Sequence, residues 1–265
     1  SGRISVAVTI PPLQNWAEQL AGGRVDIVCA VPDGGNPESY DLPPSAMVGL
    51  SKCRLYFSCG YLGFERSWLG KLSENNPRLQ VVDLSEGLEL LCGTHHHEEG
   101  HLHDGEAYPD PHIWCSPRLA RRMVETMYRA LTEIDPDGAS VYAENYARID
   151  RRFAQLDSVL TDKLRPFKGK VFAVYHPTLS YWAADYGLRQ LALEPDGKSP
   201  SPQYLRAMVD SARHVGVEVV FIQQEFDPRQ AETFAREVGC RTEIINPLAY
   251  TWSEEIMRIA DAFIR

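Results

Sequence analysis

Residues 138–164 read GASVYAENYARIDRRFAQLDSVLTDKL, and this stretch decides the architecture of the chain. It runs for 27 residues without an internal glycine or proline. Its apolar residues recur at helical spacing, at Val141, Tyr142, Ile149, Phe153, Leu156, Val159, Leu160 and Leu164. At about 1.5 Å per residue such a helix reaches roughly 40 Å. A single helix of that length predicts a stiff connection between the segments on either side, whereas a Gly/Ser linker would be flexible.

Strand-like and helical segments alternate on both sides of this helix. Before it, the strand-like segments are residues 4–10, 25–31, 54–59 and 79–83. After it, they are residues 170–175, 188–193, 217–223 and 241–246. Such alternation predicts parallel sheets that are covered by helices on both faces. We therefore expect an α/β protein of two doubly wound parallel-sheet lobes, residues 1–135 and 166–265, joined by one long rigid helix within residues 136–165.

The composition is that of an ordinary folded chain and excludes several classes of function. Among 265 residues, 27 Lys+Arg stand against 36 Asp+Glu, which gives a net charge of −9. This balance argues against a nucleic-acid-binding protein, because clustered Lys and Arg hold phosphate backbones. The sequence contains no run of about 18 apolar residues, the length that would predict a membrane-spanning helix. The six cysteines show no C-x-x-C spacing. If the protein is exported, one or two disulfides between them are an alternative to free cysteines. The chain starts directly with a strand-like run, so we expect that any signal segment has been removed.

Five of the eight histidines lie in one short polar stretch, THHHEEGHLHD, at residues 94–104. They are His95, His96, His97, His101 and His103. Imidazoles and carboxylates are the ligands that Zn²⁺ prefers. With Gly100 inside it, a glycine directly on either side and Leu102 as its single apolar residue, the stretch predicts a mobile loop over about residues 93–108 that collects metal ions. A solvated polar loop without a metal role is the alternative.

Residues 97–101 also match the H-E-x-x-H pattern of zinc proteases. That chemistry needs a rigid helix with an apolar back, whereas this segment contains Gly100 and polar neighbours. A zinc-dependent hydrolase is therefore only an alternative hypothesis. Neither a G-x-S-x-G nucleophile motif nor a G-x-G-x-x-G dinucleotide motif occurs.

Four residues outside this stretch are candidate metal ligands. His112 lies in the motif DPHIW just before a helix start, although alone it also fits a buried loop histidine that binds nothing. His176, Glu38 and Glu225 each follow a predicted strand. Because ligands of open α/β sheets bind beyond the carboxyl ends of the strands, these side chains could meet in one cleft. His214 lies at a helix end, and we expect it to cap that helix.

Several motifs together resemble the zinc- and manganese-binding solute-binding proteins of bacterial ABC importers. They are DPHIW and the following S-P at 110–117, YH and YWAADYGL within 175–188, GKSPSP at 197–202, and INPLAYTW at 245–252. The His-rich loop before the DPH motif completes the match, which runs nearly end to end. The resemblance implies two α/β lobes bridged by a long helix, with metal in the cleft between them, and this loop is associated with the zinc members.

The resemblance also implies a ligand set. His112 and His176 match two metal-binding histidines of the zinc members, while the family's first histidine ligand falls on Glu38. The carboxylate that some members supply falls on Asn246, which could bind only weakly. The family's acid after the third strand of the second lobe is moved by two residues, to Glu225. We expect His112, His176 and Glu38 to bind the ion, with Glu225 or a water completing a tetrahedral zinc site.

The expected function is that of a high-affinity extracytoplasmic zinc receptor, and not of an enzyme. The resemblance implies that the protein delivers Zn²⁺ to the membrane permease of an ABC importer. A manganese-specific receptor of the same family is the alternative, because additional oxygen ligands would discriminate less against Mn²⁺. We expect a monomer in the periplasm or another extracytoplasmic location, and a lipid anchor stays open.

Overall fold

The computed structural model describes residues 2–92, 108–195 and 197–265. The chain divides into two compact units. Unit 1 comprises Ser1–Leu88, Ser116–Ser158 and Leu248–Glu254, and unit 2 comprises Glu89–Cys115, Val159–Pro247 and Glu255–Arg265. The chain therefore passes between the units several times. The simpler division into residues 1–135, 136–165 and 166–265 stays a prediction.

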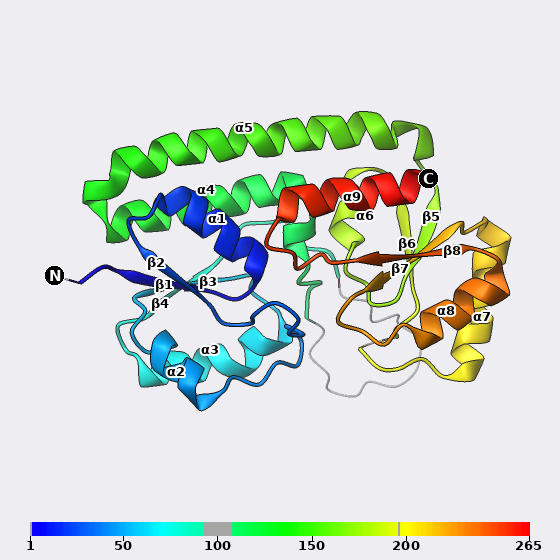
Figure 1. Cartoon of the computed structure of the whole chain (residues 1–265), viewed down its shortest axis with the longest axis horizontal. Coiled ribbons are helices and arrows are strands. Elements are labelled where there is room, and N and C mark those ends of the chain that lie inside the picture. The colour runs from blue at the N-terminus through cyan, green and yellow to red at the C-terminus, as the bar shows by residue number, and fades with distance from the viewer. Residues whose placement is uncertain (1, 93–107, 196) are drawn as a thin grey trace. The chain divides into compact units, whose positions relative to one another are not determined.

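Unit 1 is built on a parallel sheet of four strands in the order β2-β1-β3-β4. The strands are β1 (Ser5–Val8), β2 (Asp26–Cys29), β3 (Leu55–Ser58) and β4 (Gln80–Asp83). Helices α1 (Pro11–Ala21) and α4 (Pro117–Ile134) cover one face of this sheet, and α2 (Pro44–Leu50) and α3 (Gly63–Asn75) cover the other (Figure 1). Helix α2 begins at Pro44, at the end of a proline-rich stretch, and proline is a residue that the first turn of a helix accepts.

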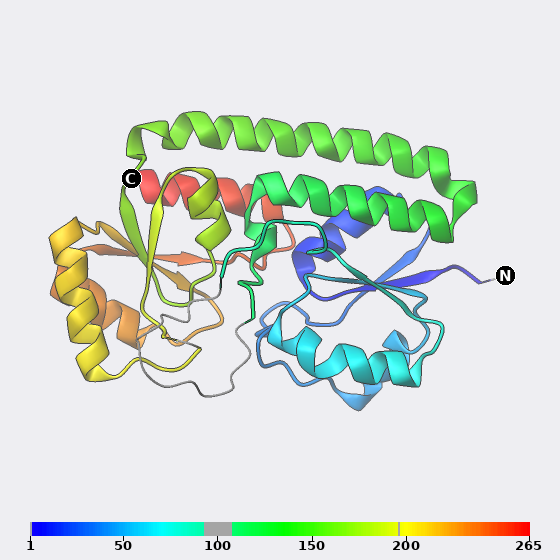
Figure 2. The ribbon, with the colours of Figure 1, turned by 180° about the vertical axis from the view of Figure 1, so that it is seen from behind.

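Unit 2 repeats this plan with the strand order β6-β5-β7-β8, again all parallel. Its strands are β5 (Val171–Val174), β6 (Arg189–Ala192), β7 (Val219–Gln223) and β8 (Arg241–Ile245). Helix α6 (Ser180–Asp185) and the larger part of α9 (Trp252–Ile264) cover one face of this sheet, while α7 (Pro202–Val215) and α8 (Arg229–Val238) cover the other (Figure 2). On the first face, Phe172 of β5 packs edge-on against Trp182 and Phe263.

Helix α5 (Ala139–Leu164) is the long helix that the sequence predicts, and its 26 residues run from unit 1 into unit 2. Within unit 1, Phe153 of α5 packs against Trp16 of α1 and Trp252, with ring centroids 5.5 Å and 4.8 Å apart. Arg121 of α4 forms an ion pair with Asp150 of α5 at 2.9 Å. Two parallel-sheet units joined by one long helix confirm the predicted α/β architecture.

Two further predictions concern the whole chain. Among the described residues, no helix combines the length with the apolar character that crossing a bilayer requires. None of the six cysteines, all of which the structure describes, is joined in a disulfide.

Candidate metal centre

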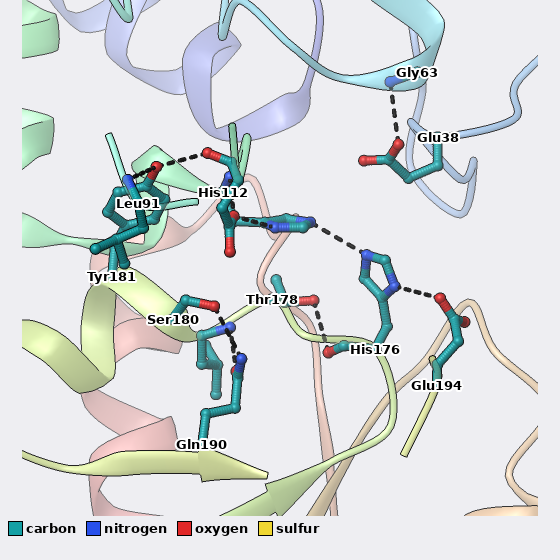
Figure 3. Close-up of polar contacts among 12 residues, drawn as sticks. Glu38, Gly63, Leu91, His112, His176, Thr178, Ser180, Tyr181, Gln190 and Glu194 are labelled. Atoms are coloured by element: carbon teal, nitrogen blue, oxygen red, sulfur yellow. Dashed lines mark hydrogen bonds and ion pairs between the residues drawn. The ribbon is translucent and has the colours of Figure 1, made fainter. Parts of the chain in front are cut away.

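His112 and His176 meet in unit 2 although 64 residues separate them in the sequence. His112 directly precedes a short 3-10 helix (Ile113–Cys115), and His176 lies two residues beyond the end of β5. The Nε2 atoms of the two rings are 3.2 Å apart (Figure 3). The ring centroids are 5.1 Å apart, with the planes at 77°. Both rings therefore present the same nitrogen to the same point.

A buried carboxylate fixes the orientation of the His112 ring. Oδ1 of Asp110 lies 2.7 Å from Nδ1 of His112 and also accepts a hydrogen bond from the His112 backbone N–H at 2.9 Å. Burial of Asp110 opposes its ionisation, but the charge and hydrogen bonds of His112 outweigh this effect, so the pKa of Asp110 lies below its usual value. The Tyr181 hydroxyl contacts the backbone of the same turn. It donates to the Asp110 carbonyl at 2.6 Å and accepts from the backbone N–H of Leu91 at 3.0 Å.

A second buried carboxylate contacts the His176 ring in the same way. Oε1 of Glu194 lies 2.8 Å from Nδ1 of His176 (Figure 3). The ring stacks on Phe226, with centroids 5.2 Å apart and planes at 19°. Gln223 holds the backbone of this turn, because its Nε2 donates to the His176 carbonyl at 2.6 Å and its Oε1 accepts from the His176 N–H.

The spacing of the two imidazoles suits a tetrahedral metal ion. Two nitrogen donors on zinc, each about 2.0–2.1 Å from the metal, lie roughly 3.3 Å from each other. The observed Nε2–Nε2 distance of 3.2 Å comes close to that value. A carboxylate on the far nitrogen of a metal-binding histidine is also the usual second contact at zinc sites. The pair can therefore bind one zinc ion with little rearrangement.

Glu38 lies in unit 1, in the turn-rich stretch between β2 and α2. The side chain of Asn36 accepts a hydrogen bond from the Glu38 backbone N–H at 3.0 Å. Oε2 of Glu38 accepts from the backbone N–H of Gly63, the first residue of α3, at 3.1 Å. Oε1 is buried and has no hydrogen-bond partner in the part of the chain that the structure describes. One carboxylate oxygen is thus anchored at a helix N-terminus and the other is available to a cation.

Glu225 and Asn246 both lie in unit 2, beyond β7 and β8. Burial raises the pKa of Glu225, and the charges of His176 and His112 act against that rise. The Glu225 carboxylate has no oxygen within 4.8 Å of the donor nitrogens of both His112 and His176. Its role as a ligand therefore stays a prediction. The backbone N–H of Asn246 donates to Glu255 at 2.7 Å, which fixes this turn through the backbone.

The predicted metal-collecting histidines, His95, His96, His97, His101 and His103, lie outside the described residues. The two ends of that stretch are described, and Cys92 pairs with Pro109 in an antiparallel bridge. His214 is exposed in the last turn of α7, where a basic side chain complements the helix dipole.

Three residues that contact the candidate ligands were not predicted from the sequence, namely Asp110, Glu194 and Gly63. Asp110 stands in the DPHIW motif, and its spacing to His112 was the available signal. Glu194 follows β6 as His176 follows β5, but the sequence gives no indication that the two strands are neighbours. Gly63 is needed because a Cβ there would lie 2.1 Å from the Glu38 carbonyl oxygen.

Comparison with known proteins places this geometry in context. A family model described as "Zinc-uptake complex component A periplasmic" (ZnuA) matches residues 6–261. The zinc-binding lipoprotein AdcA of Streptococcus pneumoniae strain R6 is 25% identical over 270 residues, which cover 96% of this chain and 52% of AdcA. The high-affinity zinc uptake system protein ZnuA of Bacillus subtilis 168 is 25% identical over 262 residues, covering 96% of this chain and 81% of that protein. This chain thus spans about half the length of the first curated relatives.

Solved structures agree in fold over nearly the whole chain. A crystal structure of ZnuA has a TM-score of 0.89 at 32% identity and covers 99% of this chain and 98% of its own. A ZnuA deletion mutant with zinc bound has the same TM-score and identity and covers 99% of this chain and 97% of its own. The Mn-bound periplasmic metal-binding protein of Candidatus Liberibacter asiaticus, with a TM-score of 0.83 at 18% identity over 98% of this chain and 100% of its own, shares the fold.

Proposed function

We infer, because this chain belongs to the periplasmic zinc-uptake complex component A (ZnuA) family, that it is a zinc-binding receptor of an ABC importer. The observation that carries this proposal is the pair of imidazoles whose Nε2 atoms lie 3.2 Å apart. Each ring has its other nitrogen on a buried carboxylate, Asp110 for His112 and Glu194 for His176. Such a pair is suited to a borderline cation such as Zn²⁺.

Glu38 is our proposed third ligand. Its Oε2 accepts the Gly63 N–H, which leaves the buried Oε1 as the oxygen that can bind the ion. We propose Glu225 or a water as the fourth ligand. Two neutral imidazoles and two carboxylates would give a neutral complex with Zn²⁺, and four such ligands suit tetrahedral zinc.

The chain acts as a carrier and not as an enzyme, since its family is one of uptake components. A catalytic zinc site keeps one coordination position open for water or substrate. With Glu225 as the fourth ligand, no such position would be left. The zinc-hydrolase hypothesis based on residues 97–101 is therefore not favoured.

We propose Zn²⁺ and not Mn²⁺ as the cargo. Two imidazole nitrogens suit zinc, whereas Mn²⁺ favours carboxylate, carbonyl and water oxygens. The relatives at 25% identity carry zinc in their names, and the likeness to the Mn-bound protein, at 18% identity, concerns the fold. Competition between Zn²⁺ and Mn²⁺ for metal-free protein tests this preference directly.

The partner that we propose is the membrane permease of the importer, to which a monomeric receptor delivers its ion. The description of the family as a periplasmic uptake component supports an extracytoplasmic location. The first curated relatives are lipoproteins, and a lipid anchor on this protein is a further proposal. Sequencing of the genes beside this one tests the partner, because permease and ATPase genes are expected there.

Calorimetric titration of metal-free protein with Zn²⁺ tests the site. We expect one tight site in the unmodified chain, loss of tight binding in His112→Ala and in His176→Ala, and markedly weaker binding in Glu38→Ala. His214→Ala is the matched control, because this imidazole is exposed in the last turn of α7. Tight binding that survives both histidine substitutions would overturn the proposed site, and unchanged affinity in Glu38→Ala would exclude the third ligand.

A further inference from the structure

We propose that Glu194 is a positioning residue that selects the metal-binding nitrogen of His176. This inference rests on the proposed zinc-receptor function, because it concerns the same site. Glu194 would act only through the imidazole that it contacts, without touching the ion. The carboxylate would hold the proton on Nδ1 and thereby keep Nε2 as the metal donor.

The register of two neighbouring strands places Glu194 beside His176. In the parallel pair β5 and β6, Val174 is opposite Ala192. Beyond the ends of both strands, the Leu193 N–H donates to the Val174 carbonyl at 2.9 Å and the Glu194 N–H donates to the Tyr175 carbonyl at 2.8 Å. His176 and Glu194 each lie two residues beyond the end of their strand, in bends, and these two hydrogen bonds hold both bends at the same edge of the sheet.

The packing around His176 makes ring orientation the property that Glu194 controls. Phe226 stacks on one face of the imidazole, and Gln223 holds the backbone at two points. Rotation of the ring by about 180° would preserve the stacking but exchange the positions of nitrogen and carbon atoms. A hydrogen bond to a ring nitrogen distinguishes the two orientations. Glu194 makes that bond at 2.8 Å to Nδ1.

A carboxylate performs this selection better than a neutral group. An ionised carboxylate only accepts hydrogen bonds, so it requires a proton on Nδ1, whereas a glutamine amide can also donate and would tolerate the other tautomer. The negative charge also raises the basicity of Nε2 toward a metal ion. Glu194 is itself only 7% exposed, and a buried carboxylate is unfavourable unless a partner such as the imidazole compensates it.

The test compares Glu194→Gln and Glu194→Ala with the unmodified protein. Substitution of such an outer contact typically lowers metal affinity about 10- to 100-fold. We expect a loss in that range for Glu194→Ala and a smaller loss for Glu194→Gln, measured by competition with a zinc-chelating dye. Glu243→Gln is the matched control, because this half-buried carboxylate of unit 2 pairs with Arg241 and Arg265 and should leave zinc affinity unchanged.

A second measurement separates positioning from a merely structural role. Long-range ¹H–¹⁵N correlation NMR reports which nitrogen of His176 carries the proton, both with and without zinc. We expect the Nδ1–H form in the unmodified protein and a mixture of forms in Glu194→Gln. Equal zinc affinity in all variants, or an unchanged tautomer in Glu194→Ala, would overturn the proposal. If the unmodified protein bound no zinc, the zinc-receptor function would fail, while the spectra of the metal-free variants would still test the role of Glu194.

Discussion

Substitution of Gly63 by alanine tests whether Glu38 binds the metal, without altering Glu38 itself. Gly63 is the first residue of α3, and its N–H donates to Oε2 of Glu38. A Cβ at this position would lie 2.1 Å from the Glu38 carbonyl oxygen and 3.0 Å from Oε2. Both atoms would have to move away.

The required displacement follows from these contacts. Ordinary van der Waals contact begins at 3.4 Å, so the Glu38 carbonyl must retreat by about 1.3 Å. Zinc–ligand distances tolerate a deviation of only about 0.2 Å, so the carboxylate cannot follow the backbone and keep its bond to the ion. We expect zinc affinity to fall at least about 10-fold. The overpacked contact should also lower the free energy of unfolding by about 1–3 kcal/mol.

Gly70 provides a matched control in the same helix. A Cβ on Gly70 meets no atom within 4 Å. We expect Gly70→Ala to keep the zinc affinity unchanged and to raise the free energy of unfolding by about 0.5–1 kcal/mol, because alanine favours the helix. Calorimetric titration measures the affinities, and urea unfolding measures the stabilities.

A double-mutant cycle then connects Gly63 to Glu38. If Gly63→Ala acts by displacing the Glu38 carboxylate, the same substitution made in Glu38→Ala should cause little further loss of affinity. Additive losses would show that the two residues act independently. Zinc affinity of Gly63→Ala equal to that of Gly70→Ala would refute the proposed role of Glu38 altogether.

Three further predictions concern other parts of the chain. Burial raises the pKa of Glu65 from 4.5 to about 7, so the stability contributed by its protonated form is complete below pH 4.5 and is lost as the pH rises through 7. Urea titrations of the unmodified protein and of Glu65→Gln give the difference between their free energies of unfolding. We expect this difference to fall by about 3 kcal/mol between pH 4.5 and pH 7. A difference that does not change with pH would contradict this prediction. Deletion of residues 94–104 should leave one tight zinc site in calorimetry and remove weaker ones. Loss of the tight site would show that this site lies in the deleted segment. Trp16→Ala should lower the free energy of unfolding by about 3–5 kcal/mol, because the buried indole packs against Phe153 and Trp252 in unit 1. The zinc affinity should change little. A loss of stability below about 1 kcal/mol in urea titration would show that this packing contributes little.

The architecture was predictable because its signals are local. An apolar residue at every third or fourth position reports a helix, and the predicted residues 138–164 agree with α5 at Ala139–Leu164. Alternation of strands and helices indicates parallel sheets, since parallel strands need crossover connections. Helix α2 was missed because its seven residues span only about two turns, which is too short for helical periodicity to be recognised.

The candidate ligands were predictable one by one, but not their surroundings. His176 and Glu225 follow strands, and His112 stands in a recognisable motif, so the residue types and the strand ends indicate a metal site. No local pattern indicates that Glu194 would contact His176, because that contact depends on the order β6-β5-β7-β8.

The sequence by itself determined two parallel-sheet units, a long connecting helix and two histidines suited to zinc. Only the tertiary structure decided which atoms of those histidines face each other and what holds them there. Strand pairing brings Glu194 to His176, and a backbone turn brings Asp110 to His112. The physical reason is that periodicity records which residues are buried within one element, whereas hydrogen bonds between side chains depend on the pairing of elements that are distant in the sequence.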